Sequence, residues 1–312
     1  MRIIRDTKFI APEDRGAVAA IGNFDGVHLG HQAVIDLTRK TAQTLNLPLG
    51  IMTFEPHPRQ FFAAEAPPFR LMNADAKANR LEKLGVERLY EVPFNEALSS
   101  LSARAFAQDI IADALGLKHV IVGADFCFGK GRTGTAEDLK SFGEEMGFGV
   151  TIAPMVALDA GEVSSTNIRQ ALADGRPRDA AAMLGHWHRI EGEVIRGDQR
   201  GRDLGYPTAN MSIDGLHPPK LGVYAVKVDV LSGQFAGTYD GAASIGVRPM
   251  FGQNKANCET FIFDFSGDLY GAELSVALVA FLRPELKFDG LEALIDQMGH
   301  DCDQARGILA DV

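Results

Sequence analysis

The sequence has few cysteines, no excess of basic residues and no long apolar run. Its three cysteines, Cys127, Cys258 and Cys302, are odd in number and far apart. Neither a disulfide framework nor a zinc-ligand spacing results, which predicts a reducing, cytoplasmic location. No apolar run is long enough to cross a bilayer, and residues 1–6 lack the apolar core of a signal peptide. We therefore expect no membrane association.

Positive charge is also scarce, since 31 Lys and Arg stand against 41 Asp and Glu, a net charge of −10. Proteins that bind nucleic acid need a basic face, so this balance argues against that partner. Small phosphates need only a local positive site and stay possible ligands. The 312 residues suit two domains better than one. None of these numbers predicts the oligomeric state.

The first half alternates strand and helix patterns. Predicted strands cover residues 18–21, 49–54, 88–92, 119–122 and 150–153. Predicted helices cover residues 31–45, 74–84, 103–115, 136–146, 166–173 and 177–184. This alternation predicts an α/β domain with a parallel sheet whose ligands sit at the carboxyl ends of the strands.

The pattern changes near Gly185, and from Ile190 the segments become short and alternate with period two. Strands are predicted at 223–231, 260–265 and 274–282, and helices at 291–298 and 303–309. We expect a small antiparallel β-barrel or sandwich with a C-terminal helix. The predicted domains are therefore 1–185 and 186–312.

The stretch from 21 to 31, Ile-Gly-Asn-Phe-Asp-Gly-Val-His-Leu-Gly-His, joins the first strand to the first helix. His28 and His31 are three apart, so both rings lie on one face at the helix start. Free N–H groups at a helix N-terminus attract anions, which predicts a nucleotide phosphate cradle. The alternative is an ordinary turn with incidental histidines. The cradle residues are Gly22, Phe24, Asp25, Gly26 and Gly30.

Two further groups of candidates follow later strands. His57 and Arg59 lie in Glu-Pro-His-Pro-Arg, where two prolines are expected to fix the backbone and forbid a helix. Asp125 stands beside Phe126 and Phe128, which suits a planar ring held by a polar anchor. Lys130 and Arg132 come next, on a loop expected to be flexible and suited to phosphates. Solvated surface loops are the alternative in both cases.

Ser164, Ser165, Thr166 and Arg169 precede or open a predicted helix. Their hydroxyls are explained by helix capping, and equally by a triphosphate facing this motif.

In the second half, Gly201 opens a loop that carries Thr208 and Asn210, whose oxygens suit magnesium held between protein and phosphates. Glu259, at the head of a predicted strand, is a candidate general base. A hairpin connection rich in turn residues and a solvated glutamate are the alternatives.

Together these stretches resemble the bifunctional riboflavin kinase/FAD synthetase family of bacteria, in order and over nearly the whole chain. The strings that carry the resemblance are Gly22-Asn-Phe-Asp-Gly-Val-His-Leu-Gly-His, Thr53-Phe-Glu-Pro-His-Pro, Val122-Gly-Ala-Asp-Phe-x-Phe-Gly, Ser164-Ser-Thr-x-Ile-Arg, Gly201-Arg-x-Leu-Gly-Tyr-Pro-Thr-Ala-Asn, Gly222-Val-Tyr-Ala, Ile245-Gly-Val-Arg-Pro, Asp264-Phe-x-Gly-Asp-Leu-Tyr-Gly and Leu282-Arg-x-Glu-x-Lys-Phe. The sequence departs from the family pattern at Met250, Asn167 and Glu259-Thr-Phe.

The resemblance implies a Rossmann-like nucleotidyltransferase domain followed by a riboflavin kinase barrel. It implies that the second domain converts riboflavin and ATP to FMN and ADP, and that the first converts FMN and ATP to FAD and pyrophosphate, both with Mg²⁺. His28 and His31 would contact ATP phosphates, helped by the cradle glycines and the 164–169 motif. Flavin contacts are expected at Asp125, Phe126, Phe128, His57, Arg59 and Arg283. Gly201, Thr208 and Asn210 would bind magnesium and ATP, and Glu259 would be the base.

The chemistry agrees with this division. The FMN phosphate is already an anionic nucleophile at pH 7, so the adenylyl site needs donors and cations, which the histidines, an arginine and a helix N-terminus would supply. Riboflavin offers a neutral hydroxyl, which needs a carboxylate base and a metal. Two alternatives stay open. One is an adenylyltransferase for another phosphorylated small molecule, with the barrel as a binding module, and the other is a non-enzymatic flavin-binding protein.

Overall fold

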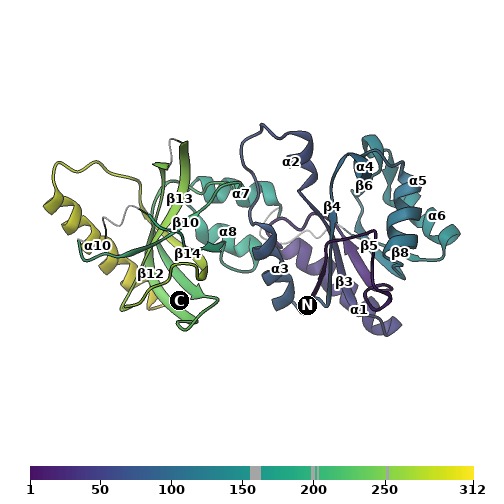
Figure 1. Cartoon of the computed structure of the whole chain (residues 1–312), viewed down its shortest axis with the longest axis horizontal. Helices are drawn as coiled ribbons and strands as arrows, with labels where there is room; N and C mark the ends of the chain where they lie inside the picture. The colour runs from purple at the N-terminus through teal and green to yellow at the C-terminus, as the bar shows by residue number, and fades with distance from the viewer. Residues whose placement is uncertain (155–162, 198–200, 202–203, 251–252) are drawn as a thin grey trace. The chain divides into compact units, whose positions relative to one another are not determined.

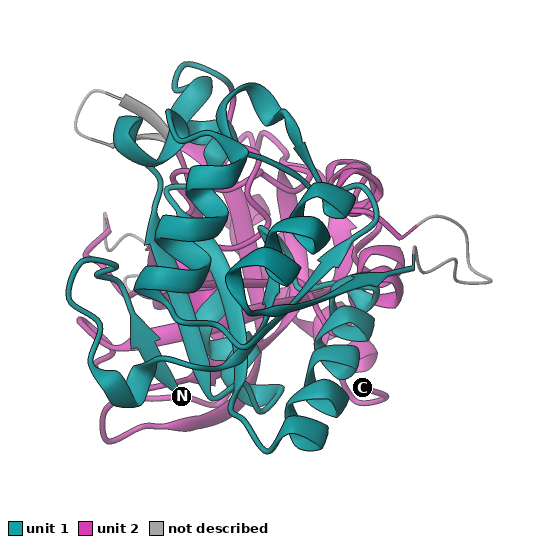
Figure 2. Ribbon diagram, turned by 90° about the vertical axis from the view of Figure 1, so that its right-hand side faces the viewer, with its two compact units in different colours: residues 1–66, 77–162 teal, residues 67–76, 163–312 magenta. Residues whose placement is uncertain are grey.

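The computed structural model describes residues 1–154, 163–197, 201, 204–250 and 253–312, with only the backbone at 248–250 and 253–255. Met250, one of the departures from the family pattern, lies where no side chain is described. The chain divides into two compact units, each described here by itself (Figure 2). The first comprises residues 1–66 and 77–162, and the second comprises 67–76 and 163–312.

The first unit is built on a six-stranded parallel sheet with helices around it (Figure 1). From edge to edge the strands are β1 (Arg2–Ile4), β4 (Arg88–Pro93), β3 (Leu49–Glu55), β2 (Val18–Ile21), β5 (His119–Gly123) and β8 (Gly149–Ala153). The helical segments are η1 (Pro12–Asp14), α1 (Leu29–Leu45), α2 (Pro58–Phe62), most of α3 (Ala74–Lys83), α4 (Glu96–Ser99), α5 (Ala103–Ala105), η2 (Phe106–Ala114), η3 (Lys130–Arg132) and α6 (Ala136–Met146). A short hairpin pairs β6 (Cys127–Phe128) with β7 (Gly134–Thr135).

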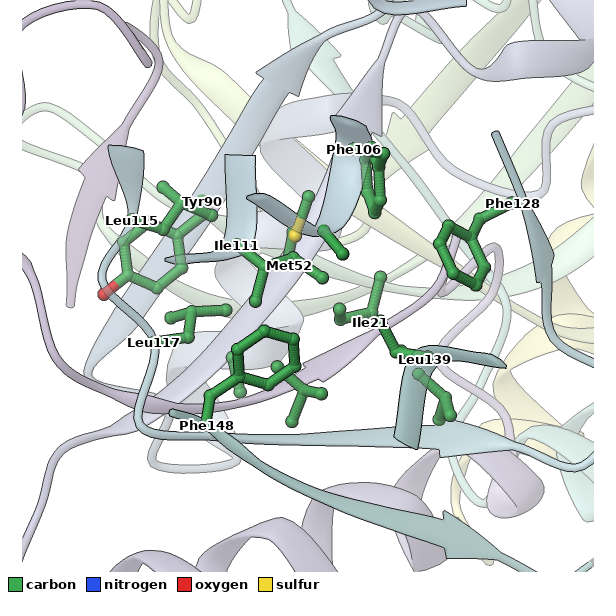
Figure 3. Close-up of a cluster of buried hydrophobic side chains, with 14 of the residues drawn as sticks. Ile21, Met52, Tyr90, Phe106, Ile111, Leu115, Leu117, Phe128, Leu139 and Phe148 are labelled. Atoms are coloured by element: carbon green, nitrogen blue, oxygen red, sulfur yellow. The ribbon is translucent and has the colours of Figure 1, made fainter. Parts of the chain in front are cut away.

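One buried cluster of this unit joins side chains of the sheet to side chains of η2 and α6, among them Ile111 and Leu139 (Figure 3). Met52 and Tyr90 project from the sheet and meet Ile111 and Leu115, and all four are inaccessible to solvent. Every residue of β2 is buried because a central strand of a covered parallel sheet is apolar on both faces. The expected α/β class is confirmed, with the carboxyl ends of β2, β3 and β5 at one edge.

Two local predictions for the first unit are wrong, and one is confirmed. Residues 58–62 form α2, although prolines were expected to forbid a helix. Pro58 occupies the first turn, where no backbone N–H is needed, and His57 caps the helix. Residues 103–115 do not form one α-helix, because a π-helix, η2, follows α5. The basic segment holding Lys130 and Arg132 is the loop of the β6–β7 hairpin, as expected, and Gly129, Gly131 and Arg132 have positive φ values there.

The second unit is an antiparallel six-stranded sheet curled into a nearly closed barrel. The strands in order are β10 (Thr208–Ser212), β13 (Gln253–Ile262), β12 (Gly237–Met250), β11 (Gly222–Val230), β14 (Glu273–Arg283) and β9 (Arg189–Glu193). A bridge between Ile195 and Asn210 joins the segment after β9 to β10. One continuous helix, α10 (Leu291–Leu309), replaces the two predicted helices and packs on β11 and β14 through Ala305 and Leu309.

Helices α7 (Ser165–Ala173) and α8 (Pro177–Leu184) pack with the second unit. Ile168, Leu172 and Leu184 form their core with Leu71, from the 67–76 segment. Compact packing thus divides the chain at residue 162, before the motif-based boundary at 185.

Candidate active sites

The turn after β2 bends sharply before it enters α1. Phe24, Gly26 and Val27 have φ values of 51°, 86° and 44°, so three residues of the turn adopt the left-handed region. His28 is the N-cap of α1, and its Nδ1 accepts the backbone N–H of His31 (3.3 Å). A Cβ at Gly30 would lie 3.2 Å from the His28 ring, so glycine allows the ring to pack against the helix start.

The two histidines form a stacked pair. Their ring centroids are 3.6 Å apart with an interplanar angle of 17°, which confirms that both rings lie on one face. Burial lowers the pKa of His28 to about 4. Burial, followed by the charges of His28 and Lys77, holds the pKa of His31 well below its ordinary range. Both imidazoles of the free protein are therefore neutral at pH 7, and as neutral rings they can offer N–H donors but no positive charge.

His31 Nδ1 is buried and has no hydrogen-bond partner among the described residues. The ring also lies against Phe24, with a centroid distance of 5.1 Å. A buried polar atom without a partner is unusual in a folded protein and marks a place where a ligand can bind. The His31 Nδ1 side of the histidine pair is thus the part of the turn that best suits binding of a phosphate.

A buried cation near this turn was missed by the sequence analysis. The Lys77 side chain is 2% exposed, and its Nζ lies 2.8 Å from Glu55 Oε1 and 3.1 Å from Thr53 Oγ1. The Thr53 hydroxyl in turn donates to the carbonyl of Asn23, inside the turn (3.2 Å). Lys77 lies on the same face of α3 as the apolar residue Leu81, and that face is buried. That signal was present in the sequence.

The predicted flavin residues after β5 lie beside a row of aromatic rings. Asp125 is exposed, and Phe126 stacks on Phe128 with centroids 5.4 Å apart. From Phe128 the row passes to Phe106 (5.5 Å) and Phe54 (6.3 Å). It continues from Phe54 through Phe94 to Phe61 and Phe62 on α2. Only Phe126 and Phe128 are stacked, whereas the pairs that Phe94 makes with Phe54, Phe61 and Phe62 are edge to face, and Phe106 and Phe128 are buried. The Phe126 ring, which is partly exposed, is therefore the member of this row that best suits a planar aromatic ligand.

His57 and Arg59 lie at the start of α2, near the outer end of this row. His57 Nδ1 accepts the backbone N–H of Arg59 (3.0 Å), so that nitrogen is occupied by the helix cap. Arg59 is exposed. Phe61 and Phe62, one turn further on, are 38% and 70% exposed. Their contribution to a flavin site stays a prediction.

The 164–169 motif belongs to the second unit by packing. Ser164 caps α7 by accepting the backbone N–H of Asn167 (3.2 Å), so the capping explanation accounts for its hydroxyl. Ser165 and Thr166 occupy the first helical turn, where N–H groups point outward. Arg169 donates to the carbonyl of Phe69 (3.1 Å). The structure thus holds His28 and His31 in one turn and the serine motif on a helix of the other unit.

The kinase candidates do meet on one face of the barrel. Thr208 and Asn210 lie on strand β10, not on a loop as predicted, and flank Ala209, which is buried in the barrel core. Asn210 stands directly opposite Glu259 in the register of β13. Opposed residues of antiparallel strands share a face, so Thr208, Asn210 and Glu259 project together. Glu259 lies well inside β13, and not at its head, because the strand begins at Gln253.

Hydrogen bonds order this group. Asn210 Nδ2 donates to Thr208 Oγ1 (3.3 Å), and Asn257 Nδ2 donates to Glu259 Oε1 (2.9 Å). A Cβ at Gly201 would lie 2.3 Å from the carbonyl oxygen of Tyr206, so only glycine fits there. Hydroxyl, amide and carboxylate oxygens are the donors that Mg²⁺ takes. The residues therefore fit the ion, and no cluster of three His, Cys, Asp or Glu side chains in the described part of the chain offers another metal site.

Arg283, predicted to contact flavin, is engaged within the second unit. Its Nε and Nη2 bind Asp301 of α10 at 2.9 and 2.7 Å, and Nη1 donates to the carbonyl of Pro284 (3.0 Å). The guanidinium also lies 5.8 Å from the Phe288 ring centroid. Its observed contacts fix α10 to the end of β14, and its role toward flavin stays a prediction.

Comparison with known proteins agrees with this layout. The family model described as FAD synthetase matches residues 10–167, and the one described as riboflavin kinase matches residues 184–309. Among the described residues, no helix combines the length and hydropathy that crossing a membrane requires. A solved structure described as a macrolide-efflux protein from Streptococcus pneumoniae is similar, with a TM-score of 0.81, 34% identity and 98% of each chain covered.

Three curated relatives share the name bifunctional riboflavin kinase/FMN adenylyltransferase. The protein from Pseudomonas fluorescens is 43% identical, covering 99% of this chain and 98% of its own. The protein from Listeria monocytogenes is 39% identical over 95% and 94%, and the one from Escherichia coli K12 is 37% identical over 96% of each. The chain therefore belongs to the bifunctional riboflavin kinase/FMN adenylyltransferase family.

Proposed function

We propose that this protein makes FAD from riboflavin in two ATP-dependent transfers, with riboflavin kinase activity in residues 186–312 and FMN adenylyltransferase activity in residues 1–185. One observation supports the assignment of one reaction to each part of the chain. The turn of the first unit presents two neutral histidines at a helix N-terminus, whereas the barrel places a carboxylate beside oxygen ligands. These arrangements suit two different nucleophiles.

In the first unit, an oxygen of the FMN phosphate attacks the α-phosphorus of ATP. The bond from that phosphorus to the bridging oxygen breaks, and pyrophosphate leaves. This nucleophile needs no base, because its second pKa is about 6. The N–H groups of the turn, together with His28 and His31, stabilise the charge that builds on the phosphate oxygens. The flavin ring lies along Phe126 and Phe128, with Asp125, His57 and Arg59 as polar contacts.

The second motif, Ser164, Ser165, Thr166 and Arg169, provides donors for ATP phosphates. Hydroxyls and N–H groups in the first turn of α7 support this assignment, since a helix N-terminus favours anions.

In the barrel, Glu259 takes the proton from the terminal ribityl hydroxyl of riboflavin. The oxygen then attacks the γ-phosphorus of ATP, and ADP leaves. Thr208 and Asn210 hold Mg²⁺, which when bound offsets the charge of the ATP phosphates. Gly201 contacts the ATP phosphates, and Arg283 contacts the flavin end of the site. The partners are thus small molecules and not nucleic acid, and three free cysteines support a cytoplasmic location.

Purified protein tests this proposal when it is given riboflavin, ATP and Mg²⁺ and its flavins are separated by chromatography. FMN should form and then FAD. Glu259→Gln should stop FMN formation and spare the conversion of supplied FMN to FAD. Replacing His28 and His31 by alanine should do the reverse. A protein that makes FAD from FMN but no FMN from riboflavin would support the single-activity alternative instead.

A further inference from the structure

The ammonium group of Lys77 is the buried charge that neither reaction above uses. Its side chain is 2% exposed, and its partners Glu55 and Thr53 come from the carboxyl end of β3, next to the turn after β2. Burial of a lysine is costly unless it is paired, and replacing a buried ion pair by apolar side chains is often neutral for stability. Stability alone therefore does not explain a lysine at this position, and its geometry needs another reason.

That geometry is a chain of hydrogen bonds that ends in the phosphate-facing turn. Lys77 Nζ donates to Thr53 Oγ1 (3.1 Å). The hydroxyl has one proton, and it donates that proton to the carbonyl of Asn23 (3.2 Å). Asn23 precedes Phe24, whose positive φ begins the bend that leads to the histidine pair. Because Lys77 occupies an acceptor position of the hydroxyl, it directs the Thr53 proton toward Asn23.

The same lysine adds charge to the site. The free histidines are neutral, and the charge of Lys77 is one of the influences that His31 experiences. Glu55 lies 2.8 Å from Lys77 Nζ, is itself one-fifth exposed, and keeps the ammonium in place. The turn is therefore connected through one threonine to the fixed ion pair of Lys77 and Glu55.

We propose that Lys77 is a positioning residue for adenylyl transfer, which through Thr53 holds the carbonyl of Asn23 and so fixes the turn that receives the ATP phosphates. This inference rests on the proposed function of the first unit. It assigns to α3, and to Thr53, a role that the motif residues do not cover. ATP, and not FMN, is the substrate whose binding depends on it.

Kinetics of the full chain test the role. In Lys77→Met, kcat/KM for ATP in the conversion of FMN to FAD should fall about 10- to 100-fold, the loss expected when a misplaced turn no longer aligns reacting groups. KM for ATP should rise while KM for FMN stays unchanged. Riboflavin phosphorylation by the same preparation should stay within about twofold, because its residues lie in the other unit. Lys83→Met, on the exposed last turn of α3, is the matched control and should behave as wild type.

The threonine separates positioning from folding. Thr53→Val removes the donor to Asn23 and should raise KM for ATP, whereas Thr53→Ser keeps the hydroxyl and should restore it. If Lys77→Met misfolds and lowers both reactions, the two Thr53 variants test the inference instead. Equal KM values for ATP in Thr53→Val and Thr53→Ser would overturn it. Wild-type kcat/KM for ATP in Lys77→Met also overturns it. A wild-type protein that forms no FAD from FMN refutes the proposed function itself.

Discussion

The histidine pair should stay uncharged until the pH is well below neutral. His28 is 9% exposed, and burial lowers its pKa from 6.5 to about 4. The difference corresponds to about 3 kcal/mol in favour of the neutral ring, since each pH unit is worth about 1.4 kcal/mol. In the free protein His28 then carries its proton on Nε2, because Nδ1 accepts the N–H of His31.

The assay is a pH titration of the histidine ring resonances by NMR on protein labelled at histidine. His28→Asn identifies the His28 signal by its loss, and asparagine keeps a side-chain acceptor at the N-cap of α1. We expect this His28 signal to titrate with a midpoint near pH 4 in the wild-type protein. A midpoint at 6 or above would refute the burial argument and would return positive charge to the free site.

Protonation of His28 should also make the free energy of unfolding depend on pH. The folded pKa lies below the unfolded value, so the unfolded chain takes up the proton first as the pH falls. Stability contributed by neutral His28 is complete above pH 6.5 and is lost between 6.5 and about 4, by at most about 3 kcal/mol. The free energy of unfolding, measured by urea denaturation at pH 7 and 5, should therefore fall more between these two pH values in the wild type than in His28→Asn. Parallel curves would contradict the linkage.

The remaining predictions concern the barrel and the two cores. Thr208→Val and Asn210→Ala should each raise the Mg²⁺ concentration for half-maximal riboflavin phosphorylation about tenfold, with FAD formation from FMN as the unaffected control. Asp301→Ala leaves Arg283 without its bidentate partner and should destabilise the second unit by about 3 kcal/mol, measured by fluorescence of Trp187, the one tryptophan. Ile111→Ala should cost about 2–5 kcal/mol in the first unit, followed by circular dichroism.

The sequence predicted the first unit well where burial leaves a local pattern. The strand at 18–21 was placed to the residue, because a central parallel strand is apolar throughout. Helix ends were placed where a glycine closes them, as Gly147 does after α6. The C-terminal helix was divided in two because the polar residues around Gly299 interrupt its apolar pattern, yet contacts of its flanks with the barrel hold it continuous.

Site residues were predictable where chemistry and local structure coincide. The stacking of His28 and His31 follows from their spacing at a helix start. Their neutral state does not, because it depends on burial by distant elements. The burial of Lys77 was visible in the apolar pattern of α3, but its partners were not, because Glu55 and Thr53 come from another strand and no short pattern contains all three residues. Contacts between elements that are distant in the sequence, and not a local pattern, therefore determine which partners a buried lysine has.

The FAD synthetase and riboflavin kinase domains belong to one polypeptide, and this has a metabolic consequence. Expression of the gene always delivers the two catalysts in equal number, so a cell cannot adjust the ratio of its two flavin cofactors by making more of one activity. That ratio must follow from rate constants, substrate levels and consumption by apoproteins. Expression level therefore sets the total capacity for flavin cofactors, whereas the balance between the two activities is set by residues within each site.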